Sequence, residues 1–93
     1  MDYVEKFLLD SKMRPSTLGF FYFIDAVHYA EKNETNMTEI YKKIAMKYKT
    51  NPLTVERHIR NIKNKICGKT SKHMGNKEAI LSMARYKTLA IIK

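Results

Sequence analysis

Hydrophobic residues recur at helical spacing along almost the whole chain, and no segment shows the strict alternation of a half-buried strand. Polar turns and two prolines separate the periodic segments from one another. With 93 residues, 44% of them hydrophobic, the chain has enough apolar side chains for one small folded domain. We therefore expect an all-α fold, a compact bundle of about five helices that occupies residues 1–93.

The second helix is expected to be the central one, because it is apolar around most of its circumference. Its inward stripe is predicted to consist of Leu18, Phe21, Ile24 and Val27. The helices are predicted to cover about residues 2–12, 16–32, 37–48, 52–66 and 76–92.

Local signals mark the ends of the third and fourth helices. Thr38 is the expected N-cap of the third helix, which directs Ile40, Ile44, Ala45 and Tyr48 inward. Asn51 is expected to cap the fourth helix, with Pro52 at its first position. The inward stripes of the last two helices are predicted to be Val55, Ile59, Ile62 and Ile66, with Cys67 buried beyond them, and then Ile80, Met83, Ala84 and Ala90 or Ile91.

Positive charge is concentrated in one segment. The chain has 18 Lys and Arg against nine Asp and Glu, a formal net charge of +9. Residues 42–72 contain ten basic residues and one acid, Glu56, so the net charge of this segment alone equals that of the whole chain. This distribution predicts a polyanionic partner. The acidic first part, residues 1–41, is expected to be scaffold that faces away from that partner.

Composition argues against several classes of protein. The single cysteine, Cys67, cannot form an intramolecular disulfide, and with three scattered histidines it makes no zinc pattern. The start of the chain lacks the basic region of a signal peptide, and the apolar run 18–24 is too short to span a membrane. The sequence shows no catalytic carboxylate pair, nucleophile–base pair or phosphate-binding glycine loop. We expect a cytosolic domain that is no enzyme and has no metal, cofactor or membrane partner.

Residues 38–66 have the layout of a helix-turn-helix: an amphipathic helix, a three-residue turn and a longer amphipathic helix with a basic outer face. Ala45 suits the close crossing of the two helices. The second helix, Pro52–Ile66, is the candidate recognition helix for the major groove of double-stranded DNA. Its candidate base-reading residues are Thr54, Glu56, Arg57 and Arg60.

Glu56 is the most informative of these residues, and it has two interpretations. Arginine can bond to guanine O6 and N7, and glutamate can accept a hydrogen bond from the cytosine amino group. A lone acid in a basic segment favours such readout, because it is repelled by phosphates. The alternative is an ion pair between Glu56 and Arg60, four residues apart on one helix.

The turn and its flanks supply candidate phosphate contacts, because backbone N–H groups and lysines commonly hold phosphates there. The candidates are Lys49, Thr50, Asn51, His58, Lys42, Lys43 and Lys63. A solvated basic face is the alternative for Lys42 and Lys43, and Lys63 extends the patch by raising the local potential. His28, on the apolar second helix, is expected to be a structural histidine rather than a ligand.

Residues 40–60, IYKKIAMKYKTNPLTVERHIR, resemble the C-terminal DNA-binding effector domain of the sporulation master response regulator of endospore-forming bacteria. The pair 44–45 and the segments 55–57 and 59–60 match that family's helix-turn-helix. Residues 18–27 are similar to its second helix, and 8–15 and 76–86 align more loosely. The resemblance implies an all-helical domain that binds short promoter elements, usually as tandem copies, and regulates transcription in the bacterial cytoplasm.

The resemblance also implies roles for single residues. The family's base-reading acid and arginine fall on Glu56 and Arg57, and Arg60 and Asn61 fall where the family approaches the DNA backbone or groove wall. The family has another arginine where this chain has Thr54, which predicts one base contact fewer and a different preferred site. Homodimer or tandem binding and contact with RNA polymerase are further expected interactions.

Two other differences from the family lie outside the helix-turn-helix. The family's long connection after the recognition helix shrinks here to about residues 68–75, a change that bears on tandem pairing. The family's receiver domain is missing from this sequence, so the chain is expected to be either a standalone relative, which the start at Met1 favours, or an excised domain. Two alternatives to a DNA-binding regulator therefore stay open. One is a protein-interaction module that pairs with or antagonises a full-length regulator, and the other is RNA binding through the same patch.

Overall fold

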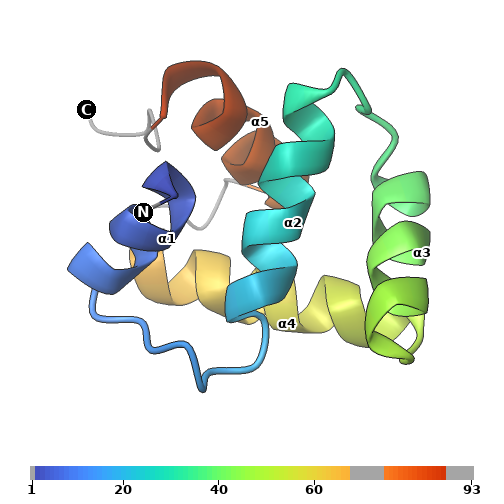
Figure 1. The fold of residues 1–93 in the computed structure, drawn as a ribbon, viewed down its shortest axis with the longest axis horizontal. Coiled ribbons are helices and arrows are strands. Elements are labelled where there is room, and N and C mark those ends of the chain that lie inside the picture. Colours follow the sequence, from blue (N-terminus) through green and yellow to red (C-terminus); the bar gives the residue numbers. More distant parts are fainter. Residues whose placement is uncertain (1, 68–74, 88–93) are drawn as a thin grey trace.

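The computed structural model describes residues 2–67 and 75–87, which form five α-helices and contain no strand. The all-α prediction is confirmed for this part of the chain (Figure 1). None of the helices in these ranges is long and apolar enough to cross a membrane. The helices are α1 (Tyr3–Asp10), α2 (Phe20–Glu31), α3 (Met37–Tyr48), α4 (Pro52–Cys67) and α5 (Asn76–Tyr86).

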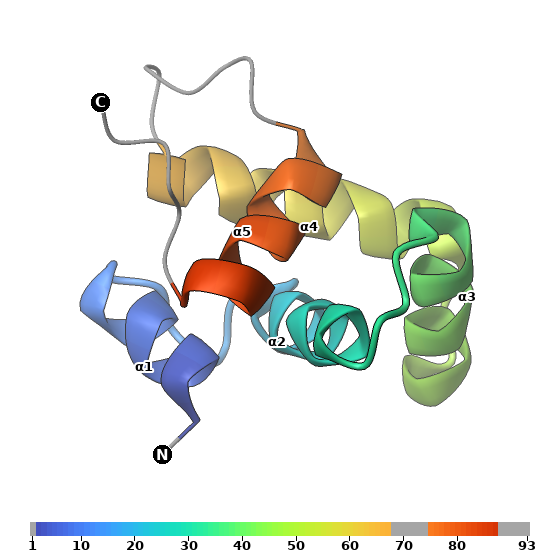
Figure 2. The same ribbon diagram turned by 90° about the horizontal axis from the view of Figure 1, so that it is seen from above.

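Helix α2 is central, as its composition predicts. It contacts each of the other four helices, and Figures 1 and 2 show it enclosed between α1, α3, α4 and α5. Its fully or almost fully buried residues are Phe20, Phe23, Ile24, Ala26, Val27 and Ala30. The core is therefore built around α2, and all five helices contribute residues to it.

The predicted inward stripe of α2 is wrong at two positions. Leu18 is 64% exposed and Phe21 is 45% exposed. Residues 15–19 form turns instead of the first helical turn, so α2 begins at Phe20 rather than near residue 16. The buried stripe then starts at Phe20 and continues through residues 23, 24 and 27, which keeps helical spacing but changes the register.

Gly19 explains where α2 begins. Its φ of +95° lies in the left-handed region, where residues with a Cβ are strained. A Cβ at Gly19 would lie 2.7 Å from the carbonyl oxygen of His58 and 3.0 Å from Cγ1 of Ile62, both on α4. The glycine thus lets the start of α2 rest directly on the middle of α4.

The bounds of α3 are confirmed, but its predicted cap is not. Asn36 is the N-cap, and its Oδ1 accepts a hydrogen bond from the Glu39 N–H at 3.3 Å. Thr38 lies inside the helix. Helix α1 ends at Asp10, earlier than predicted, and α5 ends at Tyr86.

The predicted inward residues at the end of α4 and in α5 are buried only in part. Ile80 and Met83 are buried as predicted, whereas Ala84 and Ile66 are only partly buried. The predictions for the side chain of Cys67, for the connection after α4 and for residues 90–91 lie outside the described residues.

A polar cluster joins α1 to α2 and α5. His28 Nδ1 lies 2.8 Å from Glu31 Oε1, and its Nε2 contacts the carboxylate of Asp2. Asp2 is also the N-cap of α1 and accepts a hydrogen bond from the Val4 N–H at 2.7 Å. Tyr3 donates to Glu31 and to the carbonyl oxygen of Met83 in α5. His28 is thus a partnered structural residue, as expected.

This cluster predicts a pH-dependent stability. Burial by itself would lower the pKa of His28, but hydrogen bonds to Glu31 and Asp2 outweigh it and raise that pKa above 6.5. Protonated His28 therefore gives its full contribution to stability below pH 6.5, while Asp2 and Glu31 stay ionised, and this contribution is lost as pH rises through the raised pKa. Because the side chains are partly exposed, we expect a loss of less than about 1 kcal/mol.

Urea unfolding at a series of pH values from slightly acid to slightly alkaline measures this effect. His28→Gln should remove most of the dependence, whereas His58→Gln, which leaves the cluster intact, should keep it. A wild-type profile that is unchanged by His28→Gln would contradict the role of the cluster.

Candidate nucleic-acid interface

The turn between α3 and α4 is short and held by backbone hydrogen bonds. Lys49 ends α3 in the left-handed conformation, with φ 57° and ψ 48°. The N–H groups of Lys49 and Thr50 both bond to the carbonyl oxygen of Ala45, the second at 2.9 Å. This arrangement reverses the chain within three residues and exposes the side chain of Lys49. The turn has the length expected for a helix-turn-helix.

Helix α4 begins where the sequence predicts. Asn51 Oδ1 accepts a hydrogen bond from the Thr54 N–H at 2.9 Å, and Pro52 occupies the first helical position. The Asn51 carbonyl oxygen accepts the next bond, from the Val55 N–H at 3.2 Å. The first turn of α4 is therefore well fixed.

Helices α3 and α4 pack through small and branched side chains. Ala45 is almost fully buried, which confirms the expected close crossing. Ile40 and Ile44 of α3, and Val55, Ile59 and Ile62 of α4, are fully buried in the same core. A helix-turn-helix assignment of α3 and α4 is consistent with this geometry.

The opposite face of α4 is exposed and polar. Four of its residues, Arg57, Arg60, Asn61 and Asn64, are exposed, and Thr54, Glu56 and His58 are half-buried on its flanks. Arg57 has no ion-pair partner within residues 2–67 and 75–87. A guanidinium in this position keeps all of its donors available for a ligand.

Glu56 contacts Arg60 through its Oε2, so the ion pair predicted as the alternative to base readout is present. The backbone carbonyl of Glu56 also accepts a hydrogen bond from Asn76 Nδ2 at 3.2 Å. The pair holds Glu56 at the edge of the exposed face and restrains Arg60 beside it. It does not exclude readout, because one carboxylate can accept from two donors.

Asn76 helps to position the candidate site, and the sequence alone did not identify it. Its Nδ2 bonds to the Tyr41 hydroxyl at 3.2 Å as well as to the Glu56 carbonyl, and so ties the start of α5 to both helices of the candidate helix-turn-helix. Burial is the main cause of a raised pKa for Tyr41. Asn76 is 35 residues from Tyr41 and 20 residues from Glu56 in the sequence, so no local sequence signal predicts these two hydrogen bonds.

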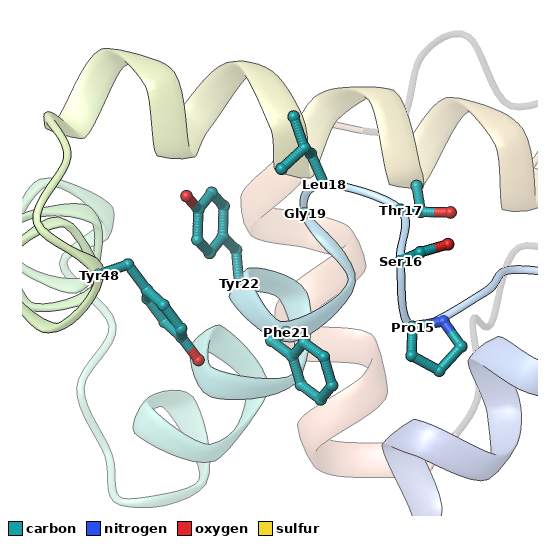
Figure 3. A pocket seen from close by; sticks show the side chains of 8 residues that line it. All are labelled: Pro15, Ser16, Thr17, Leu18, Gly19, Phe21, Tyr22 and Tyr48. Carbon is teal, nitrogen blue, oxygen red and sulfur yellow. The ribbon is translucent and has the colours of Figure 1, made fainter.

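His58 belongs to an aromatic row that crosses three helices. Its ring centroid lies 6.1 Å from that of Tyr22, and the Tyr22 centroid lies 5.1 Å from that of Tyr48. Figure 3 shows Tyr22 and Tyr48 facing one another below α4. Tyr48, predicted to point inward, is instead partly exposed at the end of α3. Its hydroxyl donates to Asp25 at 2.7 Å, and burial together with this bond raises its pKa to about 12.

The lysines of α3 lie beside acids. Lys42 is 3.8 Å from Glu39, and Lys43 is 3.3 Å from Glu34. Lys47 is 3.0 Å from Asp25, a bond that raises the pKa of this lysine. Glu34 and Asp25, two acids of the first part of the chain, therefore lie beside lysines of the basic segment. That this first part faces away from a polyanionic partner stays a prediction.

Among the candidate phosphate contacts, Lys63 is buried. Only 7% of it is exposed, because it lies on the flank of α4 next to the core rather than on the outer face. The remaining phosphate candidates, Lys42, Lys43, Lys49, Thr50, Asn51, His58 and Asn61, are exposed or half-buried along α3, the turn and α4.

In the described part of the chain, no group of three or more His, Cys, Asp or Glu residues is placed to hold a metal ion. Residues 4–89 match the sequence profile of the family described as "Sporulation initiation factor Spo0A C terminal". No curated protein and no solved structure matches the chain.

Proposed function

Because the chain belongs to the family of Spo0A C-terminal domains, which are DNA-binding effector domains and not enzymes, we propose that it is a sequence-specific regulator of transcription that binds double-stranded DNA. Helix α4 lies in the major groove in this proposal, and the protein acts in the bacterial cytoplasm. The observation that carries it is the exposed outer face of α4, where Arg57 stands without an ion-pair partner among the described residues.

Base readout is assigned to the first two turns of α4. Arg57 bonds to guanine O6 and N7, and Glu56 accepts from the amino group of a neighbouring cytosine. Arg60 orients the Glu56 carboxylate through their ion pair and reaches the groove wall. Thr54, half-buried beside the turn, supplies a hydroxyl in place of the arginine that other members of the family carry.

Phosphate contacts are assigned to the turn and its neighbours. Lys49 and the hydroxyl of Thr50 are assigned to the phosphates at the start of α4, because the Thr50 N–H already bonds to the Ala45 carbonyl oxygen. Asn51 can donate from its amide nitrogen because its oxygen caps the helix. His58 and Asn61 lie further along α4. Lys42 and Lys43 join the set by exchanging their carboxylate partners for phosphates. Lys63 is left out because it is buried.

Arg57→Ala is expected to relax specificity at one guanine and to weaken binding to the preferred duplex by about 1–3 kcal/mol. Lys49→Ala should weaken binding to preferred and scrambled duplexes alike. Alanine is the suitable replacement for Lys49, because it bears the same backbone strain at φ 57°, whereas glycine would relieve it. Selection from a random DNA library followed by titration of single-base variants measures both effects.

The opposite results would refute this assignment. If Arg57→Ala kept the full preference for one duplex over scrambled duplexes, α4 would not be the reading helix. If the wild-type chain selected no motif at all, sequence-specific binding itself would be rejected. Competition by structured RNA in the same titration separates DNA binding from the alternative of RNA binding.

Pairing of two copies on DNA and contact with RNA polymerase extend the proposal on the strength of the family alone. Sedimentation of the chain with duplexes that carry one or two copies of the selected motif tests the pairing. Cooperative binding to the double site supports it, and independent binding contradicts it.

An exposed apolar patch favours a second candidate function. Leu18, Phe21 and Tyr48 border an open pocket of about 190 Å³ between the α1–α2 connection and the end of α3, shown in Figure 3. Clusters of exposed apolar side chains mark protein-interaction sites. In this second proposal the chain pairs with a full-length regulator of the same family and antagonises it. Tight binding to such a regulator that Leu18→Asp abolishes, with equal affinity for all duplexes, would support this candidate over the first.

A further inference from the structure

Leu53 is an unusual residue for its position. It is the second residue of α4 and is 62% exposed, on a face that is otherwise made of polar and charged side chains. It borders an open hollow of about 310 Å³, lined also by Thr38, Tyr41, Pro52 and Glu56, and does not fill it. A large aliphatic side chain is thus presented outward at the start of the candidate recognition helix.

The position of Leu53 relative to Arg57 is fixed by the helix. Residues four apart lie on one face, with Cβ atoms about 5–6 Å from each other. Successive base pairs of DNA are spaced about 3.4 Å apart. Side chains at positions 53 and 57 therefore reach base edges that lie one or two steps apart in the same groove.

We propose that Leu53 reads the C5-methyl group of a thymine one or two base pairs from the guanine bound by Arg57. The inference rests on the proposed DNA-binding function and adds a third element to its readout. The thymine methyl is the one apolar group that a base presents in the major groove, and apolar side chains are its matching contacts. Arg57 ends in a charged group, and the half-buried Thr54 offers a single methyl group, so neither supplies an apolar surface as large as that of Leu53.

The test replaces each thymine of the library-selected duplex, one at a time, by deoxyuridine, which pairs identically but lacks the methyl group. One thymine is expected at which this replacement weakens binding by about fourfold, the effect of one lost buried methyl. Leu53→Ala should weaken binding to the thymine duplex by a similar or larger factor and should bind the thymine and deoxyuridine duplexes equally. Leu53 is exposed, so its replacement should leave thermal unfolding unchanged.

Met46→Ala is the matched control. Met46 is an apolar residue of similar size that is 80% exposed on α3, and its loss should leave the sensitivity to deoxyuridine intact. If Leu53→Ala retained the wild-type sensitivity, or if no thymine responded, the inference would be overturned while specific binding through Arg57 stood. If no duplex were selected at all, the proposed function would fail first.

Discussion

Gly19→Ala is expected to lower the free energy of unfolding by roughly 2–5 kcal/mol, the sum of a left-handed backbone strain and an overpacked contact. The added Cβ would meet the carbonyl oxygen of His58 at 2.7 Å, and backbone cannot move aside as a flexible side-chain tip can. A domain of this size is stabilised by only about 5–14 kcal/mol, so this one methyl group would remove a large share of it. The midpoint of thermal unfolding should fall by roughly 10–30 °C.

Gly75→Ala is the matched control, because nothing lies within 4 Å of a Cβ at Gly75 and its φ of −86° suits any residue. It should cost no more than about 1 kcal/mol, the scale of an N-cap preference. Urea and thermal unfolding followed by circular dichroism compare the two variants. Equal stability of Gly19→Ala and the wild type would contradict the direct contact between the start of α2 and the middle of α4.

The same contact connects stability to the candidate site. His58, whose carbonyl meets Gly19, lies one residue after Arg57 on α4. If the Gly19→Ala variant folds by pushing α2 away from α4, the orientation of α4 relative to the α3–α4 turn changes, and with it the direction of the outer face of α4. We therefore expect Gly19→Ala to bind the selected duplex less tightly than Gly75→Ala, even at temperatures where both are folded.

Local signals in the sequence were sufficient for the helix-turn-helix. The start of α4 follows from the Asn51 cap and Pro52, whose effects act within a few positions. The bounds of α3 follow from its helical periodicity, although its cap is Asn36 and not Thr38. Helical periodicity likewise identified the buried stripe of Val55, Ile59 and Ile62. The resemblance to a known family rested on this same segment, and the family match over residues 4–89 confirms it.

Features that depend on long-range contacts could not be predicted in this way. The left-handed conformation of Gly19 is useful only because α4 lies against it, so the sequence suggested a helix that began earlier and buried Leu18. Lysine is normally a surface residue, but Lys63 is buried by the packing of its helix. The bonds of Asn76 to Tyr41 and Glu56 likewise join elements that are distant in sequence.

Charges that are separated along the chain lie close together in the fold. Counting charges along the chain placed the acids and the basic segment in separate regions, whereas the fold puts Glu34 beside Lys43 and Asp25 beside Lys47. The basic surface in the absence of DNA is therefore partly neutralised, and part of the charge available to a polyanion is exposed only by exchange of partners. This exchange can be measured.

Binding to the selected duplex is expected to weaken by about 40-fold between about 50 and 200 mM salt, if the three lysines Lys42, Lys43 and Lys49 each neutralise a phosphate. This corresponds to a log–log slope of about −2.7, or −0.9 for each phosphate contact. If only Lys49 did so, the slope would be about −0.9 and the loss about 3.5-fold. The slope thus measures whether the α3 lysines leave their carboxylates.

We expect the larger slope, because surface ion pairs of this kind are worth only about 0.2–1 kcal/mol and are easily exchanged. The double variant Lys42→Ala, Lys43→Ala should reduce the slope by about 1.8. Lys32→Ala is the control: Lys32 follows the end of α2, about 18 Å along the helix from the contact with α4, and its loss should leave the slope unchanged. Glu34→Gln and Glu39→Gln should tighten binding at low salt, because they release the two lysines in advance. If the double variant kept the wild-type slope, the α3 lysines would belong to a solvated face, and the contacts with phosphate would be confined to the turn and α4.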